Sequence, residues 1–570
     1  MLRDTFASGR ASEDETYAAI TEELTRSGEL LCPHSAVGVK VADQFQSTTP
    51  MITLATAHPA KFPAAVEKAT GQHPPLPPHM ADLYERDERV TRKTKMAGAN
   101  VMTLQAADGA FVEQLKAVLP SAAFQADPAG FLSEPRGRWV GRGIVVSPSN
   151  VEEVSVLLAH CHAARVPVVP YSGGTGLVGG QIVEDLVPVV VSLARMNTVR
   201  AVYPQENVIE VDAGVILADV QVAAADVGRL FPLSLASEGS ARIGGLLATN
   251  AGGLNVIRYG NARAQVLGVE VVLADGRIWN GMSRLRKDNT GYDLRDLMIG
   301  SEGTLGIITG ASLRVMPQPA QEGTAMFIVS SPKDAVSLLA IAGERLGETV
   351  SAFELIHRQG FDFLDEVGLD YKAPFTTAPE WCVLMKVGVS AGQSAQGALE
   401  GVFEAAGGLI SDGVIAQSEQ QARDLWAIRE MIPEGNRRIG SVSSHDISVP
   451  ISCVPDFIDR APAILAKIGV FRINCFGHLG DGNLHYNVFP QQGRSRADHE
   501  DQRDAIKAAV HDLTHSFGGS VSAEHGIGRL KVADLETYGD PVKLAMMRAV
   551  KDALDPHGIM NPGAVLRLPA

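Results

Sequence analysis

The sequence predicts an α+β protein in which two large folded parts follow a short N-terminal extra segment. Residues 109–192 alternate between helical and strand periodicity, in the order helix, strand, helix, strand, strand. Two apolar strands, at residues 326–330 and 381–389, flank a helical segment, which is typical of an antiparallel sheet covered by helices. A Pro-rich stretch followed by mixed charge, at residues 72–95, marks the end of the first segment.

Length and composition narrow the class of protein. The 570 residues correspond to about four domain-sized units. The net charge of −15 argues against a nucleic-acid partner, which requires a basic face. Five scattered cysteines without a CxxC pair indicate free thiols in a reducing compartment. The start of the chain lacks the apolar region of a secretory signal, and no run approaches the roughly 18 apolar residues of a transmembrane helix, so we expect a cytoplasmic protein.

The first segment, residues 1–95, has helical spacing at residues 13–30 and an expected buried strand near residues 51–57. The stretches PHSAVGVKVADQF, TPMITLATAHPAKFPAAVEKATG and LPPHMADLYERDERV resemble the C-terminal end of threonine synthase, a pyridoxal-phosphate enzyme family. The cofactor lysine of that family belongs to the part that is missing here, so Lys61 is interpreted as a surface residue. We predict a fused remnant without catalysis, with Met96 or Met102 as the original start of the second part.

A glycine-rich loop joins two predicted strands in the sequence VPYSGGTGLVGGQ, residues 169–181. It contains the pattern GxGxxG, but a Rossmann site needs a helix directly after the loop. The following QIVEDLVP is too short for that helix and contains Pro188. Five glycines between residues 173 and 180 would still let successive backbone N–H groups converge on an anion. A diphosphate site is favoured over the alternative, a tight strand connection, which rarely needs five glycines.

The loop and two later stretches, ASEGSARIGGLLATNAGGLNVIRYG and RLRKDNTGYDLRDLMIGSEGTLGIIT, resemble the flavin-binding domain of the vanillyl-alcohol-oxidase (PCMH) type. The resemblance implies this fold over residues 96–317 and FAD as cofactor. Residues 166–181 contain no histidine for a covalent link, so we expect non-covalent FAD. Lys287, Asn289 and Tyr292 are interpreted as structural. The residues that the resemblance assigns to FAD are Pro170, Gly173, Gly174, Thr175, Gly176, Pro232, Ser234, Gly239, Gly245, Thr249, Asn250, Gly252, Gly253, Glu302, Gly303 and Ile308.

Two histidines and an acidic–histidine pair carry the chemistry of the C-terminal half. His478 and His485 flank a GDG turn, which suits two short elements that return both imidazoles to one point. Glu524 and His525 are adjacent, so one can bind a metal while the other faces a substrate. Two histidines and a carboxylate form a three-ligand site with open positions, as a catalytic divalent metal requires. The alternative, satisfied core histidines, is less suited to four such groups in glycine-punctuated stretches.

The stretches GHLGDGNLHYN, SAEHGIG and ALDPHGIMNPGAVL resemble FAD-linked D-2-hydroxyacid dehydrogenases, above all the D-2-hydroxyglutarate group. The resemblance implies that His478, His485 and Glu524 bind zinc or a similar divalent ion, that His525 is the base, and that Asn487 contacts the substrate. It also implies oxidation of a small 2-hydroxy acid to the 2-oxo acid with hydride transfer to flavin N5. We then expect residues 318–515 to form a cap domain that lies over the flavin face and contains the metal-binding histidines. We expect residues 516–570 to return to the FAD domain and to carry Glu524 and His525.

Substrate recognition is where the sequence departs from that group. Arg429 matches an arginine that binds a substrate carboxylate, and its alternative is a solvated helix-face charge. Pro433 stands where relatives carry a hydroxyl residue, and Ser444 where they usually carry lysine. Arg437, Arg438 or His445 is a candidate for the missing positive charge.

These departures leave alternatives to a D-2-hydroxyglutarate-like substrate. A related enzyme for D-lactate or glycolate is one, and a flavin-binding protein with an impaired substrate site is another. A pyridoxal-phosphate enzyme would need a Schiff-base lysine, which the sequence does not offer. The expected electron acceptor is an electron-transfer flavoprotein, a quinone or a cytochrome, through which the protein would reach a membrane. The sequence leaves open whether the protein is a homodimer.

Overall fold

The computed structural model describes residues 9–45, 53, 57–78, 104–137 and 139–568. Contacts divide the chain into two units, Met1–Ala99 and Asn100–Ala570, which are described separately. The predicted boundary at residues 95 and 96, together with Met96 and Met102, lies outside the described residues. None of the helices in the described parts is long and apolar enough to cross a membrane.

The described residues of the first unit include the α-helices α1 (Glu13–Ser27), α2 (Pro33–Ala42) and α3 (Pro63–Thr70). Helix α1 starts at the predicted place because Ser12 and Glu15 form a reciprocal capping box. The small core of this unit consists of Ala19 and Ile20 from α1 and Ala36 from α2. Lys61 is exposed, as expected of a surface residue, and most of the strand expected near residues 51–57 lies outside the described residues.

The second unit begins with a three-stranded parallel sheet in the order β1 (Ile144–Val146), β3 (Val189–Ser192), β2 (Val168–Tyr171). Helices α4 (Gly109–Val118) and α5 (Val151–Ala164) bury their apolar residues against it. These five elements follow the predicted order, and no helix lies between β2 and β3 in this described stretch. The glycine loop therefore connects two parallel strands directly, and the rejection of a Rossmann site is confirmed.

A five-stranded antiparallel sheet follows, in the order β4-β5-β9-β7-β8. Helices α6 (Leu217–Ala225) and α7 (Ile243–Ala248) share its core, and α8 (Val256–Tyr259) and α9 (Leu294–Met298) follow along the chain. The strands are β4 (Val199–Tyr203), β5 (Val208–Asp212), β7 (Val266–Val272), β8 (Ile278–Gly281) and β9 (Ile307–Arg314), and the short β6 (Arg229–Leu230) and β10 (Met316–Pro317) pair separately.

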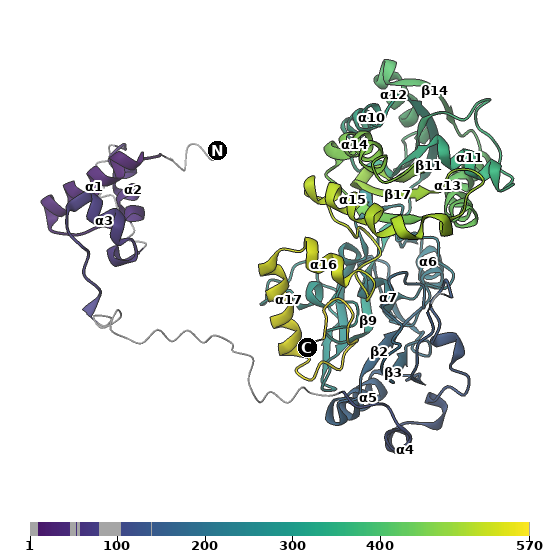
Figure 1. Ribbon diagram of the computed structural model, residues 1–570, viewed down its shortest axis with the longest axis horizontal. Helices are drawn as coiled ribbons and strands as arrows, with labels where there is room; N and C mark the ends of the chain where they lie inside the picture. Colours follow the sequence, from purple (N-terminus) through teal and green to yellow (C-terminus); the bar gives the residue numbers. More distant parts are fainter. Residues whose placement is uncertain (1–8, 46–52, 54–56, 79–103, 138, 569–570) are drawn as a thin grey trace. The chain divides into compact units, whose positions relative to one another are not determined.

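A seven-stranded sheet forms the other large part of this unit, and all its pairings are antiparallel. Helices α10, α12, α14 and α15 pack on one face, and α11 and α13 on the other (Figure 1). The antiparallel sheet with covering helices is therefore confirmed. In sheet order the strands are β14 (Ile410–Ile415), β11 (Gln321–Val329), β13 (Trp381–Val389), β12 (Val350–His357), β16 (Arg472–His478), β17 (Asn483–Phe489) and β15 (Ser443–Ser448). The helices are α10 (Pro332–Leu346), α11 (Arg358–Glu366), α12 (Ala395–Ala406), α13 (Glu419–Ile439), α14 (Val454–Leu465) and α15 (Arg503–Ser516).

The C-terminal residues, with α16 (Val532–Tyr538) and α17 (Pro541–Leu554), lie beside the three-stranded and five-stranded sheets (Figure 1). The backbone of Ile559 and Asn561 hydrogen-bonds to Val168 of β2. Upstream, Ser520 pairs with Ser448 at the end of β15. Residues 520–528 thus run from the edge strand of the seven-stranded sheet toward the glycine loop.

Candidate active site

The two histidines of the HLGDGNLH stretch are brought together by a strand–turn–strand unit. β16 ends at His478, a short 3-10 turn (Leu479–Asp481) follows, and β17 begins at Asn483. Gly482 has φ +80, and a Cβ there would lie 2.3 Å from the Val449 carbonyl oxygen, so the tight turn requires glycine. The imidazole centroids of His478 and His485 are 5.4 Å apart.

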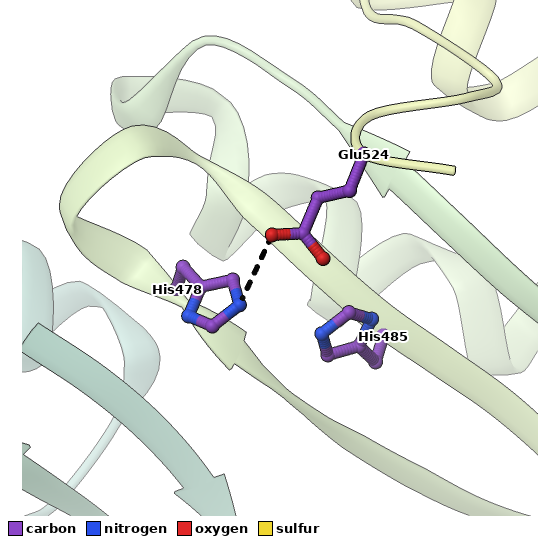
Figure 2. Close-up of side chains that lie close together, drawn as sticks. All are labelled: His478, His485 and Glu524. Atoms are coloured by element: carbon purple, nitrogen blue, oxygen red, sulfur yellow. Dashed lines mark ion pairs between the residues drawn. The ribbon is translucent and has the colours of Figure 1, made fainter. Parts of the chain in front are cut away.

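Glu524 completes a cluster with these two histidines. One ligand atom from each residue lies within 4.8 Å of the others. Figure 2 shows the two imidazoles and the carboxylate pointing toward one another, with Nε2 of His478 3.4 Å from Oε1 of Glu524. The residues come from β16, β17 and the turn after Ser520, so the fold joins positions that the sequence separates widely. The donor set of two imidazoles and one carboxylate suits a divalent transition metal.

Glu354 on β12 is a member of this site that sequence reasoning missed. It is fully buried, and its Oε1 lies 2.5 Å from Nδ1 of His478. Its Oε2 accepts a hydrogen bond of 2.7 Å from Nε of Arg429. Burial alone would raise the pKa of Glu354, but the charges of His478 and Arg429 lower it to about 2. A carboxylate behind a metal-binding imidazole fixes the ring and leaves the outer nitrogen for the metal.

The two imidazoles have opposite electrostatic environments. Burial would lower the pKa of His478, but the charge and hydrogen bond of Glu354 raise it to about 9. Burial and the charge of His478 lower the pKa of His485 to about 3. Burial also raises the pKa of Glu524, against the opposite effect of His478. His485 is therefore neutral near pH 7, whereas His478 carries a proton that a ligand role must displace.

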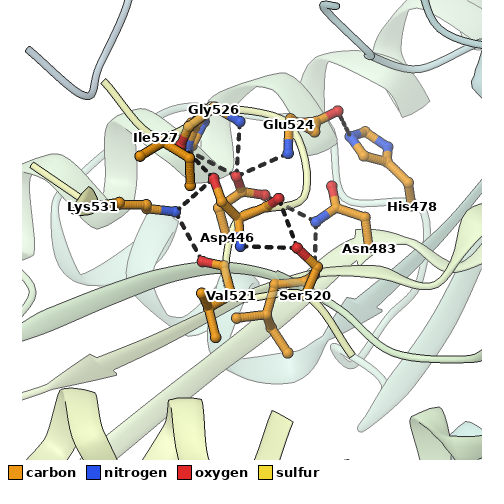
Figure 3. Close-up of polar contacts among 12 residues, drawn as sticks. Asp446, His478, Asn483, Ser520, Val521, Glu524, Gly526, Ile527 and Lys531 are labelled. Atoms are coloured by element: carbon orange, nitrogen blue, oxygen red, sulfur yellow. Dashed lines mark hydrogen bonds and ion pairs between the residues drawn. The ribbon is translucent and has the colours of Figure 1, made fainter. Parts of the chain in front are cut away.

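Asp446 on β15 holds the turn that carries Glu524 and His525, and it too was missed. Its Oδ2 accepts the backbone N–H of Glu524 at 3.0 Å (Figure 3). The same oxygen accepts the backbone N–H of His525 at 3.0 Å and lies 3.2 Å from Nδ1 of that ring. Its Oδ1 accepts a 3.0 Å hydrogen bond from Asn483. Burial would raise the pKa of Asp446, but the charges of His525, His485 and Lys531 and the backbone hydrogen bond from His525 hold it well below its usual range. The ionised carboxylate therefore orients the His525 ring through Nδ1.

A second carboxylate, that of the half-buried Glu302, holds the same turn. Oε1 and Oε2 of Glu302 accept the N–H groups of Ile527 and Gly528, each at 2.7 Å. Glu302 has φ +52, a left-handed conformation that costs energy for a residue with a side chain. It follows the end of α9 at Met298 by four residues, in a stretch whose resemblance to flavin-binding domains implies contact with FAD. Glu302 and Asp446 together fix residues 524–528 between the two large parts of the unit.

A cavity next to His525 is lined by the glycine loop, α7 and residues 301–308. Gly174 has φ +68, and a Cβ there would lie 2.0 Å from the Tyr171 hydroxyl, so this wall needs glycine for close packing. Ten of the residues predicted to bind FAD line this cavity: Pro170, Gly173, Gly174, Thr175, Gly176, Gly245, Thr249, Glu302, Gly303 and Ile308.

The other six predicted FAD residues lie elsewhere. Oδ1 of Asn250 accepts the backbone N–H of Arg263, on the wall of a different cavity. A Cβ on Gly252 would lie 3.1 Å from Oε1 of Glu524, so this glycine makes room for the metal-ligand candidate. The remaining four, which are also absent from the lining of the cavity next to His525, are Pro232, Ser234, Gly239 and Gly253.

The predicted substrate residues lie around the metal-ligand cluster. Arg429 on α13 is 6% exposed, so the alternative of a solvated charge is wrong. Its Nε is bonded to Glu354, and its guanidinium lies 4.7 Å from the Phe476 ring. Asn487 is buried and donates to the His485 carbonyl oxygen at 3.3 Å. Pro433 is exposed on α13.

Ser444 is exposed on β15, where its hydroxyl lies 2.7 Å from that of Ser441. It pairs with Asn487 across the strands, so both side chains lie on one face of the sheet. His445 cannot replace the missing lysine because strand alternation turns it to the opposite face, where its ring packs 5.4 Å from His511. Arg437 and Arg438 are exposed and both bind Glu434. Lys287, Asn289 and Tyr292 are exposed as well.

Comparison with known proteins places these features in context. Residues 143–281 match the FAD binding domain family, and residues 318–565 match the C-terminal domain of FAD linked oxidases. Residues 35–104 match the threonine synthase C-terminal family, which confirms the resemblance of the first segment. The first of these matches includes the glycine loop and residues 236–260, and it confirms the prediction of an FAD-binding domain.

Curated relatives span most of the chain. A mitochondrial D-2-hydroxyglutarate dehydrogenase of Arabidopsis thaliana is 36% identical over 74% of this chain and 75% of its own length. The D-2-hydroxyglutarate dehydrogenase of Xanthomonas citri is 36% identical over 79% of this chain and 95% of its own. A putative mitochondrial D-lactate dehydrogenase of Schizosaccharomyces pombe is 32% identical over 85% of this chain and 91% of its own length.

The fold recurs among solved structures of low sequence identity. p-Cresol methylhydroxylase matches with a TM-score of 0.64 at 17% identity, over 81% of this chain and 98% of its own. An alkyldihydroxyacetonephosphate synthase matches with a TM-score of 0.60 at 18% identity, over 81% of this chain and 87% of its own. The predicted α+β, PCMH-type architecture is confirmed.

Proposed function

The chain belongs to the FAD-linked hydroxyacid dehydrogenases, and we propose that it oxidises a D-2-hydroxy acid, similar to D-2-hydroxyglutarate, to the 2-oxo acid. The observation that carries this proposal is the convergence of His478, His485 and Glu524 beside His525, which itself lines the cavity of the glycine loop. The candidate metal ligands and the candidate base thus lie next to the cavity that the glycine loop lines. Non-covalent FAD, bound along the glycine loop, would supply an electron acceptor for the α-hydrogen as hydride at N5.

His478, His485 and Glu524 would hold zinc or a similar divalent ion. The fit rests on the donor set, on the spacing of the ligand atoms within 4.8 Å, and on Glu354 behind Nδ1 of His478. His478 would exchange its Nε2 proton for the ion, whereas the low pKa of His485 leaves that ring ready to bind. A divalent ion in this position would act as a Lewis acid on the substrate hydroxyl.

His525 would accept the hydroxyl proton. Asp446 lies 3.2 Å from Nδ1, which favours the tautomer with hydrogen at Nδ1 and a free electron pair at Nε2. Burial lowers the pKa of His525, against the opposite effect of Asp446, so the ring is neutral near pH 7 and able to take a proton. The four backbone N–H groups bound by Asp446 and Glu302 hold this base in place.

The recognition of the substrate side chain supports a second candidate substrate class, the monocarboxylates. Ser444 lies across from Asn487 with its hydroxyl bound to Ser441, and it supplies no positive charge to a distal carboxylate. This observation favours a monocarboxylate such as D-lactate or glycolate. Arg429 remains a candidate for a carboxylate contact through its Nη groups, since its described hydrogen bond to Glu354 uses Nε.

Substitution of lysine at Ser444 tests which class is used. Ser444→Lys should raise kcat/KM for D-2-hydroxyglutarate relative to D-lactate by about tenfold, because an ammonium group beside Asn487 would form a charge-assisted bond to the distal carboxylate. Both substrates, with D-malate and glycolate, would be assayed for 2-oxo acid formation with a dye as electron acceptor. Ser441→Lys is the matched control. An unchanged ratio in Ser444→Lys would show that this position does not meet the distal carboxylate, and no 2-oxo acid from any of the four would contradict the proposed reaction.

We also propose that the reduced flavin passes its electrons to an external electron-transfer flavoprotein, quinone or cytochrome. A cytoplasmic location, with membrane contact only through that acceptor, is supported by the five free cysteines, because free thiols persist in reducing compartments. Fractionation of cells with an antibody to the chain would test the location, and recovery in an oxidising compartment would contradict it.

A further inference from the structure

A second cavity lies in the FAD-binding part, and arginines dominate its wall. It has a volume of about 480 Å³ and is bordered by α9, residues 261–267 and the end of β9. Its arginines are Arg263, Arg286, Arg295 and Arg314, and its one acidic lining residue is Asp296. It shares no lining residue with the cavity next to His525. This cavity is therefore separate from the proposed active site.

The positive charge of this cavity is only partly neutralised. Arg295 is paired with Asp293 at 2.6 Å and with Asp296 at 3.1 Å. Arg263 donates to the carbonyl oxygen of Ile299 at 2.7 Å, and Arg314 to that of Ala264 at 3.3 Å. Carbonyl oxygens carry no net charge, and the two guanidinium groups form no ion pair with any residue that the structure describes.

Two further observations indicate that an anion would be a favourable ligand of this cavity. The Nε atoms of Arg263 and Arg314 are buried without a hydrogen-bond partner among the described residues. Burial and the nearby Arg286 both lower the pKa of Arg314, which means that like charges are crowded in a partly desolvated place. The chain as a whole carries a charge of −15, so this concentration of arginines is contrary to its general balance.

We propose that this cavity binds a multivalent phosphate-class anion, either free phosphate or the phosphate of a nucleotide. Planar guanidinium groups match the oxygens of a phosphate in paired hydrogen bonds, and lysine would not do so with the same geometry. Arg286 and Arg314 would meet the anion with guanidinium charges that the acidic lining residue, Asp296, does not pair with, and Arg263 is a third cationic lining residue.

The position of the cavity gives the bound anion a way to act on the flavin site. α9 leads directly into residues 299–303, and Arg263 binds the Ile299 carbonyl oxygen. Three residues later, Glu302 holds Ile527 and Gly528 and lines the flavin cavity. An anion that joins Arg263, Arg286 and Arg314 would brace this segment, so FAD release should become slower when phosphate is bound.

The test uses the holoenzyme, saturated with FAD and then freed of unbound FAD. The bound cofactor keeps phosphate out of the cavity next to His525, and no free FAD, itself a nucleotide, competes for the arginine cavity. Titration calorimetry with inorganic phosphate and with AMP, at constant ionic strength, would measure binding to the native protein and to Arg286→Gln/Arg314→Gln. We expect one phosphate per chain, with a Kd at least about tenfold weaker in the double variant, because charge-assisted hydrogen bonds are lost. Tighter binding of AMP than of phosphate would identify a nucleotide as the ligand, and equal binding would identify free phosphate.

Arg277→Gln/Arg284→Gln is the matched control, since Arg277 pairs with Asp275 and Arg284 with Glu206, outside the cavity lining. This control should keep the native Kd. Arg286 is exposed, so Arg286→Gln alone keeps the test valid if the double variant does not fold. No phosphate binding to the native holoenzyme, or an equal loss in both double variants, would overturn the proposal. FAD dissociation, followed by flavin fluorescence with and without phosphate, is a readout independent of catalysis.

Discussion

Replacement of Asp446 by asparagine should lower kcat/KM by about 10²–10⁴-fold, the range that a positioned general base contributes. An asparagine can keep one of the backbone hydrogen bonds to Glu524 and His525, but it removes the negative charge at Nδ1 of His525. Its amide can also donate to Nδ1, which would stabilise the tautomer with hydrogen at Nε2. In that tautomer the free electron pair is on Nδ1, so Nε2 cannot accept the substrate proton. Steady-state kinetics with a dye acceptor would measure the loss.

Asp534→Asn is the control for the general effect of removing a buried carboxylate. Asp534 is 8% exposed on α16 and pairs with Lys507 at 2.7 Å, away from the proposed base. It should keep kcat/KM near the native value even if thermal stability falls. Flavin content of Asp446→Asn should equal that of the native protein, because Asp446 is not part of the flavin cavity lining. Native kinetics in Asp446→Asn would contradict the assigned role of this residue.

Replacement of Glu354 by glutamine should weaken zinc binding by about 10–100-fold, the usual effect of removing a carboxylate behind a metal-bound histidine. Glutamine has nearly the same shape, but it no longer carries the charge that orients Nδ1 of His478 at 2.5 Å. The same change leaves Arg429 buried without its ionic partner, so the unfolding midpoint should fall as well. Competition with a chromophoric chelator would give the zinc affinity, and thermal unfolding the stability.

The two effects of Glu354→Gln can be separated. When Arg429→Met is combined with Glu354→Gln, the double variant no longer carries the unpaired charge of Arg429. It should recover thermal stability without recovering zinc affinity. Glu322→Gln, an exposed carboxylate on β11 that pairs with Lys386, should change neither quantity. Native zinc affinity in Glu354→Gln would show that Glu354 supports the fold but not the metal site.

Short-range patterns predicted much of this protein because they depend on neighbouring residues. The alternation of helix and strand at residues 109–192, and the turn that joins His478 to His485, follow from local periodicity and from the glycines of the GDG turn. Strand alternation was also sufficient to place His445 on the face opposite Asp446, so its proposal as a substitute for lysine could have been excluded from the sequence.

The contacts that decide the chemistry are long-range and have no local signature. Glu354 is 124 residues from His478, and Asp446 is 78 residues from Glu524. The sequence shows only that an acidic residue interrupts an apolar strand, at Glu354 in SAFELIH, and such an interruption is the signal that could have identified it. The resemblance of the glycine-rich stretches to flavin-binding domains assigned Asn250 and Gly252 to FAD. In the structure Asn250 borders the arginine cavity, and Gly252 makes room for Glu524.

The measurement that most directly tests a metal-assisted reaction with His525 as base is anaerobic reduction of the bound flavin, followed by loss of its visible absorbance. D-2-hydroxyglutarate and D-lactate would each be mixed with native protein, chelator-treated protein, chelator-treated protein reloaded with zinc, and His525→Ala. We predict rapid bleaching of the native protein by at least one substrate, its loss after chelation, recovery with zinc, and slowing by at least about 10² in His525→Ala. Native rates of bleaching in the metal-free protein, or in His525→Ala, would contradict this account.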